Sequence, residues 1–225
     1  MTTVLAIRDS TKITVKDTRG EFSDSDRDKM IKEAIEEYSR DKPNLTDELL
    51  TGDGTAQEFA VPITWVKGFS VLVELEFPID EVPQNLLTIQ DTVLIVQKLA
   101  LERIQLISLT LGAAEQARIF FTAPHLQDAS TIYINDEEAI ANLASSKIAR
   151  GLAAFYAESL DPNLADAINY QGKAETFSAL ADDLRKMYDE HITQGETDGA
   201  VVLHSDKDIS FLWRRDLLFH PRLLR

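Results

Sequence analysis

The sequence predicts an α+β fold, in which a helical bundle carries an inserted, mainly antiparallel β lobe and ends in an extended C-terminal arm. Three observations predict it. Apolar residues recur at helical spacing near the N-terminus, alternate with polar residues from about residue 51, and return to helical spacing from residue 135. Connections between the alternating runs are short and lack a crossover helix, which favours antiparallel pairing. The first helix cannot bury its stripe alone, so we expect it to pack on the later helices.

The first predicted helix spans residues 23–39. Ser23 is well suited to be its N-cap, and acidic residues crowd its first turn, where they complement the helix dipole. Asp41-Lys-Pro43 ends it. One stripe holds the apolar residues Met30, Ile31, Ala34, Ile35 and Tyr38.

The β lobe is predicted from runs of alternating residues. In residues 71–77 the apolar Val71, Val73, Leu75 and Phe77 alternate with Leu72, Glu74 and Glu76, which indicates a strand with one buried face. Residues 98–103 fit either a strand or a helical turn. The other candidate strands are residues 57–61, 92–97, 104–110, 118–122 and 131–134.

Three helices are predicted after the lobe. Asn135, with Glu138 three residues later, forms a capping-box pattern for a helix that reaches Phe155. Asp161-Pro162 opens a short helix over residues 161–169. A third helix spans residues 173–192, and Gly195 is expected to stop it.

These elements divide the chain into four segments. We expect residues 1–50 to hold the N-terminal segment with the first bundle helix, and residues 51–134 to form the β lobe. Residues 135–195 supply the later bundle helices, and residues 196–225 form the arm.

The chain is acidic, with a formal net charge of −15 over 225 residues and a pI near 4.6. An acidic surface repels phosphate groups, so the body is not expected to bind nucleic acid or anionic lipid. The arm differs: residues 135–200 carry 13 acidic and five basic side chains, whereas residues 201–225 carry three and five. The arm therefore opposes the body in charge.

Cysteine is absent, which excludes disulfides, thiolate metal ligands and a cysteine nucleophile, and is compatible with assembly in a reducing compartment. The N-terminus lacks the pattern of a secretory signal, and no stretch approaches the roughly 20 apolar residues that span a bilayer. We expect a soluble protein that is not exported through a signal peptide.

The motifs for metal or phosphate binding do not match. Asp24-Ser-Asp26-Arg-Asp28 resembles the start of a calcium loop, but Lys29 and Ile35 occupy positions that require glycine and glutamate. Gly52-Asp-Gly54 is interpreted as a turn, and no glycine-rich phosphate loop is present. The four histidines, at positions 125, 191, 204 and 220, lack the spacing of a zinc site.

Catalytic patterns are equally weak. Glu74 and Glu76 could form a carboxylate pair, but the exposed face of a strand is the simpler interpretation. His204-Ser-Asp206 has the residue types of a catalytic triad in adjacent positions, where the side chains cannot meet. We therefore predict no catalytic residue, no cofactor and no metal.

The arm is the strongest candidate for function. It is too short to form its own core, and it holds many large apolar groups that need cover. From these residues alone, docking on the bundle as a last strand or helix and binding to a partner are equally compatible. The predicted partner-binding residues are Phe211, Trp213, Arg214, Arg215, Leu218, Phe219, Arg222 and Arg225.

Several blocks between residues 25 and 193 together resemble the head-tail connector, or adaptor, proteins of tailed bacteriophages. Each block alone is ordinary turn and strand chemistry, and their order along the chain carries the resemblance. The blocks run from Ile35 to Pro43, from Thr51 to Trp65, from Gly68 to Pro78, from Ile119 to His125, and from Leu143 to Tyr156.

The resemblance implies a non-enzymatic structural protein of the virion neck, assembled in the host cytoplasm. Such subunits form a ring, typically of twelve copies, beneath the portal protein. The ring extends the channel and offers the tail, or other neck proteins, a platform, while DNA passes without specific binding. Their C-terminal arms reach the portal or neighbouring subunits. The β lobe departs from the smallest, mainly helical members, and its task is not implied.

Two alternatives stay open at this point. The chain could be another neck or tail component, such as a stopper or a tail terminator, although those are usually smaller and richer in β structure. It could also be an enzyme with a site in a cleft of the β lobe that uses Asp53, Glu74 or His125.

Overall fold

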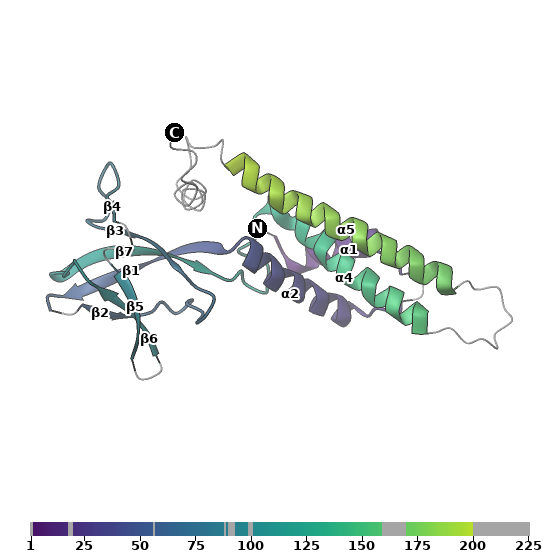
Figure 1. Ribbon diagram of the computed structural model, residues 1–225, viewed down its shortest axis with the longest axis horizontal. Coiled ribbons are helices and arrows are strands. Elements are labelled where there is room, and N and C mark those ends of the chain that lie inside the picture. The colour runs from purple at the N-terminus through teal and green to yellow at the C-terminus, as the bar shows by residue number, and fades with distance from the viewer. Residues whose placement is uncertain are drawn as a thin grey trace, which may run out of the picture. The chain divides into compact units, whose positions relative to one another are not determined.

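A computed structural model describes residues 2–17, 20–55, 57–87, 89, 93–98, 101–158 and 170–199. It confirms the α+β class, with helices at both ends of the described chain and strands between them (Figure 1). The helices are α1 (Val4–Thr14), α2 (Asp24–Asp41), the 3₁₀ turn η1 (Ile134–Asp136), α4 (Glu137–Glu158) and α5 (Tyr170–Gly199). The strands are β1 (Asn44–Asp53), β2 (Glu58–Ala60), β3 (Leu72–Glu76), β4 (Leu86–Leu87), β5 (Val93–Lys98), β6 (Leu101–Leu106) and β7 (Ala113–Ala123).

The chain divides into two compact units. The helical unit combines Met1–Lys42 with His125–Arg225, and the β unit is Pro43–Pro124. These boundaries differ from the expected 51–134 for two reasons. The lobe begins earlier because β1, which the sequence did not predict, starts at Asn44. It ends earlier because the turns after Pro124 bury Ala129 and Ile132 in the core of the helical unit.

Helix α2 forms as predicted. Ser23 accepts a hydrogen bond from the Asp26 backbone N–H, while the Asp26 carboxylate accepts one from the Ser23 backbone N–H, so the capping box is complete. The helix ends at Asp41, and Ile31 and Tyr38 on its stripe are fully buried. Helix α1 was not predicted. Thr3 caps it, and its Ile7 is buried in the same core as Tyr38.

The later helices correct three predictions. Asn135 does not cap α4 but lies within η1, and residues 131–134 form turns rather than a strand. Helix α5 continues through Gly195 to Gly199, and a helix tolerates an interior glycine at a cost of about 1 kcal/mol. The short helix predicted for residues 161–169 lies outside the described residues.

The β unit consists of two antiparallel sheets that share one core. The first has the order β1-β7-β3-β4, and the second has the order β2-β6-β5. Their common core includes Leu75 of β3, Ile119 and Phe121 of β7, and Ile104 and Leu106 of β6. Residues 98 and 101–103, which fitted two interpretations, belong to the strands β5 and β6, where Lys98 pairs with Leu101.

Strand β3 does not have the predicted exposed face. Its pairing with β7 shifts between Leu72 and Glu74, so the simple alternation of buried and exposed residues breaks at this irregularity. After the irregularity, Leu75 faces the core opposite Ile119, and Glu76 lies on the other face, where it is fully buried rather than exposed. Its carboxylate accepts a hydrogen bond of 2.8 Å from Arg118 of β7 and another of 3.2 Å from the backbone N–H of Asp80.

We expect Arg118→Met to destabilise the β unit by about 3–5 kcal/mol, because it leaves the buried Glu76 carboxylate without its cation. Arg118→Lys, which keeps the charge and loses the planar fork, should cost less. Denaturant titration followed by Trp65 fluorescence, in a Trp213→Phe background, measures the difference. A cost for Arg118→Met below about 0.5 kcal/mol, the range of an ordinary surface substitution, would contradict this role of the pair.

Candidate functional site

The predicted partner-binding residues, from Phe211 to Arg225, lie outside the described residues, which end at 199. Their role in binding therefore stays a prediction. Within the described residues, the candidates for a functional surface are two polar clusters and a set of exposed apolar side chains.

The structure assigns the three residues of the enzymatic alternative to different units. Asp53 accepts hydrogen bonds from the backbone N–H and the hydroxyl of Thr55, as a turn residue does. Glu74 belongs to β3 of the β unit, whereas His125 belongs to the helical unit. The predicted cleft site in the β lobe therefore does not include His125.

The polar cluster that the structure does assemble lies where the chain leaves and re-enters the helical unit. We define this crossover cluster as Ser39, Lys42, His125, Thr131, Asp136 and His191. The backbone N–H of His125 donates to the Ser39 hydroxyl over 3.0 Å, and the ring nitrogens of His125 lie 3.0 Å from the Lys42 carbonyl and 3.1 Å from the Thr131 hydroxyl. Residues 42 and 125, on either side of the inserted β unit, are thus joined directly.

Asp136 completes the crossover cluster from the end of η1, directly before α4. Its carboxylate lies 3.0 Å from the Lys42 ammonium and 2.8 Å from the Nε2 atom of His191 on α5. Asp136 itself is almost fully buried, while Lys42 and His191 are partly exposed. The carboxylate therefore links α5 to the segment that leads into the β unit.

Burial and hydrogen bonding shift the pKa values in this cluster. Burial would raise the pKa of Asp136, but the hydrogen bonds from His191 and Lys42 outweigh it and hold the pKa below its ordinary value. Burial lowers the pKa of His125, whose ring packs on Tyr38 with centroids 5.0 Å apart. Burial, reinforced by the charge of Asp136, raises the pKa of Tyr38.

This geometry suits a structural clamp better than catalysis. Both ring nitrogens of His125 are engaged, and the Asp136 carboxylate has two partners, so none of these groups is poised to move a proton to or from a substrate. Sequence reasoning missed the cluster because its members come from three separate stretches of chain, residues 39–42, 125–136 and 191. The positions of His125 directly after Pro124 and of Lys42 directly before Pro43 carry no recognisable motif.

The depressed pKa of His125 predicts that the protein loses stability as the pH falls. The folded state keeps this ring neutral while the unfolded chain binds a proton below about pH 6.5, so the contribution is complete above that pH and is lost as pH falls toward the folded-state pKa. We expect the free energy of unfolding to fall less in His125→Gln than in the wild type between about pH 7.5 and about pH 5. Denaturant titrations followed by far-ultraviolet circular dichroism measure both slopes, and equal slopes would contradict the prediction.

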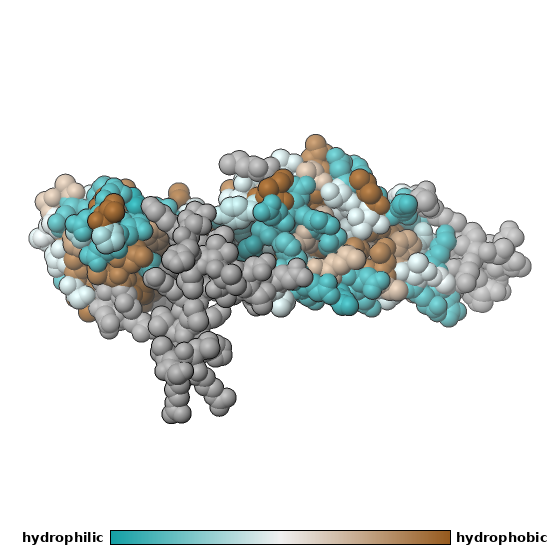
Figure 2. Space-filling view, turned by 90° about the horizontal axis from the view of Figure 1, so that it is seen from above, coloured by the Kyte–Doolittle hydropathy of each residue, from teal (hydrophilic) through white to brown (hydrophobic). Residues whose placement is uncertain are grey.

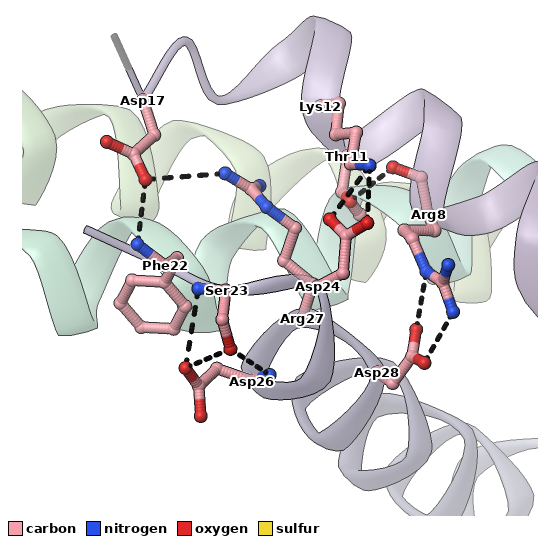
Figure 3. A network of polar contacts seen from close by, with 10 residues as sticks. All are labelled: Arg8, Thr11, Lys12, Asp17, Phe22, Ser23, Asp24, Asp26, Arg27 and Asp28. Carbon is pink, nitrogen blue, oxygen red and sulfur yellow. Dashed lines mark hydrogen bonds and ion pairs between the residues drawn. The ribbon is translucent and has the colours of Figure 1, made fainter. Parts of the chain in front are cut away.

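A second polar cluster joins α1, α2 and the turn between them (Figure 3). Asp17 and Arg27 are almost fully buried, with 3.5 Å between carboxylate and guanidinium, and Asp17 also accepts a 2.8 Å hydrogen bond from the backbone N–H of Phe22. Lys12–Asp24 and Arg8–Asp28 pair nearer the surface. Lys12, Asp17, Phe22, Asp24 and Arg27, but not Arg8 or Asp28, border an open pocket of about 300 Å³.

The described surface is mixed rather than uniformly polar. Figure 2 shows apolar patches on both units among hydrophilic areas. Large apolar side chains that are at least two-fifths exposed include Leu5 and Ile13 on α1, Phe155 on α4 and Met187 on α5. Such side chains mark contact surfaces when they gather, and are unremarkable when single.

None of the described helices is both long enough and apolar enough to cross a membrane. Within the same residues, no three histidine, aspartate or glutamate side chains lie close enough to hold a metal ion.

Comparison with known proteins gives little. No family model matches the chain, and no curated protein matches it. Among solved structures, a chain from the neck of an empty gene transfer agent (GTA) particle, computed with C6 symmetry, is 16% identical with a TM-score of 0.30, over 77% of this chain and 87% of that chain. A chain from the virion of a native GTA particle gives the same values. A chain from the neck of a native GTA particle, computed with C12 symmetry, is 17% identical with a TM-score of 0.27, over 66% of this chain and 79% of that chain. Backbone agreement this low does not establish a shared fold.

Proposed function

We propose that this chain is a head-tail connector subunit of a tailed-phage virion, located in the neck. Twelve copies form a ring beneath the portal, extend the channel through which DNA passes, and give the tail or other neck proteins a surface to attach to. The protein is structural and has no catalytic task.

The observation that carries the proposal is the order of connector-like blocks from residue 25 to 193, together with the split architecture. The blocks imply a helical bundle, and the β-rich segment between them implies an insertion. In the described part of the chain, the helical unit takes its residues from before and after the segment that forms the antiparallel β unit. A fold can host many functions, so this agreement supports the proposal without deciding it.

Charge is the second support. Helix α5 exposes five acidic side chains, Glu175, Asp182, Asp183, Asp189 and Glu190. Three of them, Asp182, Asp189 and Glu190, pair with Arg150, Arg185 and Lys186, so the excess negative charge comes from Glu175 and Asp183. Negative charge along a channel wall keeps a DNA backbone from adhering as it passes. The arginines of the arm have the opposite sign and can pair with carboxylates of another subunit or of the portal.

Mass measurement of the protein alone, and mixed with purified portal, tests the proposal. We expect a salt-dependent ring, or a complex with the portal that holds one ring of subunits, because charge contributes to the contacts. A protein that stays monomeric at all salt concentrations and does not bind the portal would contradict it. A smaller ring that binds only to an assembled connector would instead indicate a stopper or a terminator.

A further inference from the structure

Within the described residues, the two sheets of the β unit end in four edges, and the edges differ in length. β1 and β4 are the edges of the first sheet, and β2 and β5 are the edges of the second. β4 has two residues and β2 has three, whereas β1 has ten and β5 has six. Short edges offer little backbone for another chain to pair with, but long regular edges are templates for strand addition unless something covers them.

β1 is a long edge that is regular over most of its length and carries acidic side chains. Its register with β7 is unbroken from Asn44 to Thr51, and the irregularity comes only at the end, between Thr51 and Asp53. It contains no proline and no lysine. Asp47, Glu48 and Asp53 make it acidic, so two β1 edges brought together would repel one another.

β5 is a long edge of a different character. Its sequence is Val93-Leu-Ile-Val-Gln-Lys98, four successive apolar residues with one base and no acid. All six residues pair with β6 in regular register, and the Ile95 side chain is 38% exposed. An apolar, β-branched edge without proline is prone to aggregation, so a stable soluble protein is expected to cover it.

We infer that β1 of one copy pairs with β5 of the next copy, so that main-chain hydrogen bonds run from the first sheet of one subunit into the second sheet of its neighbour. The inference rests on the proposed ring. A closed ring of more than two subunits needs a contact between two different surfaces, whereas pairing of one edge with itself closes a two-fold dimer. The two long edges differ, and the acidic edge complements the edge that carries no acid.

Cysteine cross-linking tests the pairing cleanly, because the natural chain has no cysteine. Glu48 of β1 and Ile95 of β5 are both exposed and suit substitution. The reagent is a short bis-maleimide that spans neighbouring strands, which lie about 5 Å apart. On the portal, Glu48→Cys/Ile95→Cys should give a ladder of linked multimers that extends to the full ring. A mixture of the two single variants should give linked dimers, and either variant alone should give none.

A charge placed on the β5 edge provides the matched functional test. Ile95→Lys should abolish ring formation while leaving a folded monomer, because it puts a charge among the apolar residues of the edge, whereas the natural Lys98 stands at the end of the strand. Ile95→Thr, which keeps the β-branched shape, should still assemble. Ile107→Lys is the surface control, since Ile107 is 48% exposed in the same unit and lies outside the strands. It should assemble as the wild type does.

Distinct results would overturn the inference. If Glu48→Cys/Ile95→Cys assembles into a ring on the portal but gives no ladder of linked multimers, the β1–β5 pairing is wrong and the proposed function still stands. Linked dimers from Glu48→Cys alone would show two-fold β1 pairing. A ladder that appears only after deletion of residues 201–225 would show that the arm occupies one of the edges. Absence of a wild-type ring, with or without portal, would overturn the proposed function and the inference with it.

Discussion

Removal of residues 211–225 is expected to leave a folded chain that no longer joins its ring or the portal. The core clusters of both units are built from residues before 193, so the truncated chain should keep its helix content and its thermal transition. The truncation removes Trp213, Phe219 and four arginines at once. Tryptophan and arginine are among the residue types that contribute most to binding energy at interfaces. Because each contact repeats around the ring, we expect binding to the portal to weaken by about 100-fold or more.

Light scattering of the truncated protein mixed with portal measures the loss, and circular dichroism checks the fold. The full-length double variant Trp213→Ala/Phe219→Ala is the matched control for chain length. It should lose most of the binding, since it removes the two largest apolar anchors and keeps the charges. Normal assembly of the truncated protein with portal would exclude the arm as the assembly device.

The second large effect is expected at the buried pair of Asp17 and Arg27. Asp17→Asn keeps an acceptor for the Phe22 backbone N–H but removes the charge, so it leaves the guanidinium buried without a counter-ion. Arg27→Met likewise leaves the Asp17 carboxylate buried without a counter-ion. We expect each single variant to lower the free energy of unfolding by about 3–5 kcal/mol, and the double variant to cost much less than their sum.

Denaturant titration of the four proteins in this cycle measures the coupling. Lys12→Met is the matched control, because it breaks the exposed pair with Asp24 on the same two helices and should change stability far less. If the two single variants proved as mild as Lys12→Met, the pair would not be holding the turn between α1 and α2.

Local signals in the sequence predicted α2 well because the N-cap, the apolar stripe and the signal that ends the helix all agree there. Ser23 caps it, Ile31 and Tyr38 are buried, and the helix ends just before Pro43. The sequence failed at β1, whose central Thr46, Asp47 and Glu48 do not alternate with apolar residues. This strand is held by its long pairing with β7, about 70 residues later, and pairing at that distance leaves no local pattern.

The polar clusters were unpredictable for the same reason. Glu76 lies on the face predicted to be exposed, but Arg118, its partner on β7 and 42 residues later in the chain, covers it there. In the crossover cluster, Lys42 and Asp136 are 94 residues apart. Periodicity finds the faces of single elements, but it does not find which elements meet.

Imaging of the intact virion neck tests the central claim most directly, because it places the chain and counts its copies in one measurement. We predict twelve copies in a single ring in direct contact with the portal, with residues 201–225 of each copy on the portal or on a neighbouring subunit. Density for this chain in the tail or the capsid shell, or its absence from the neck, would contradict the account.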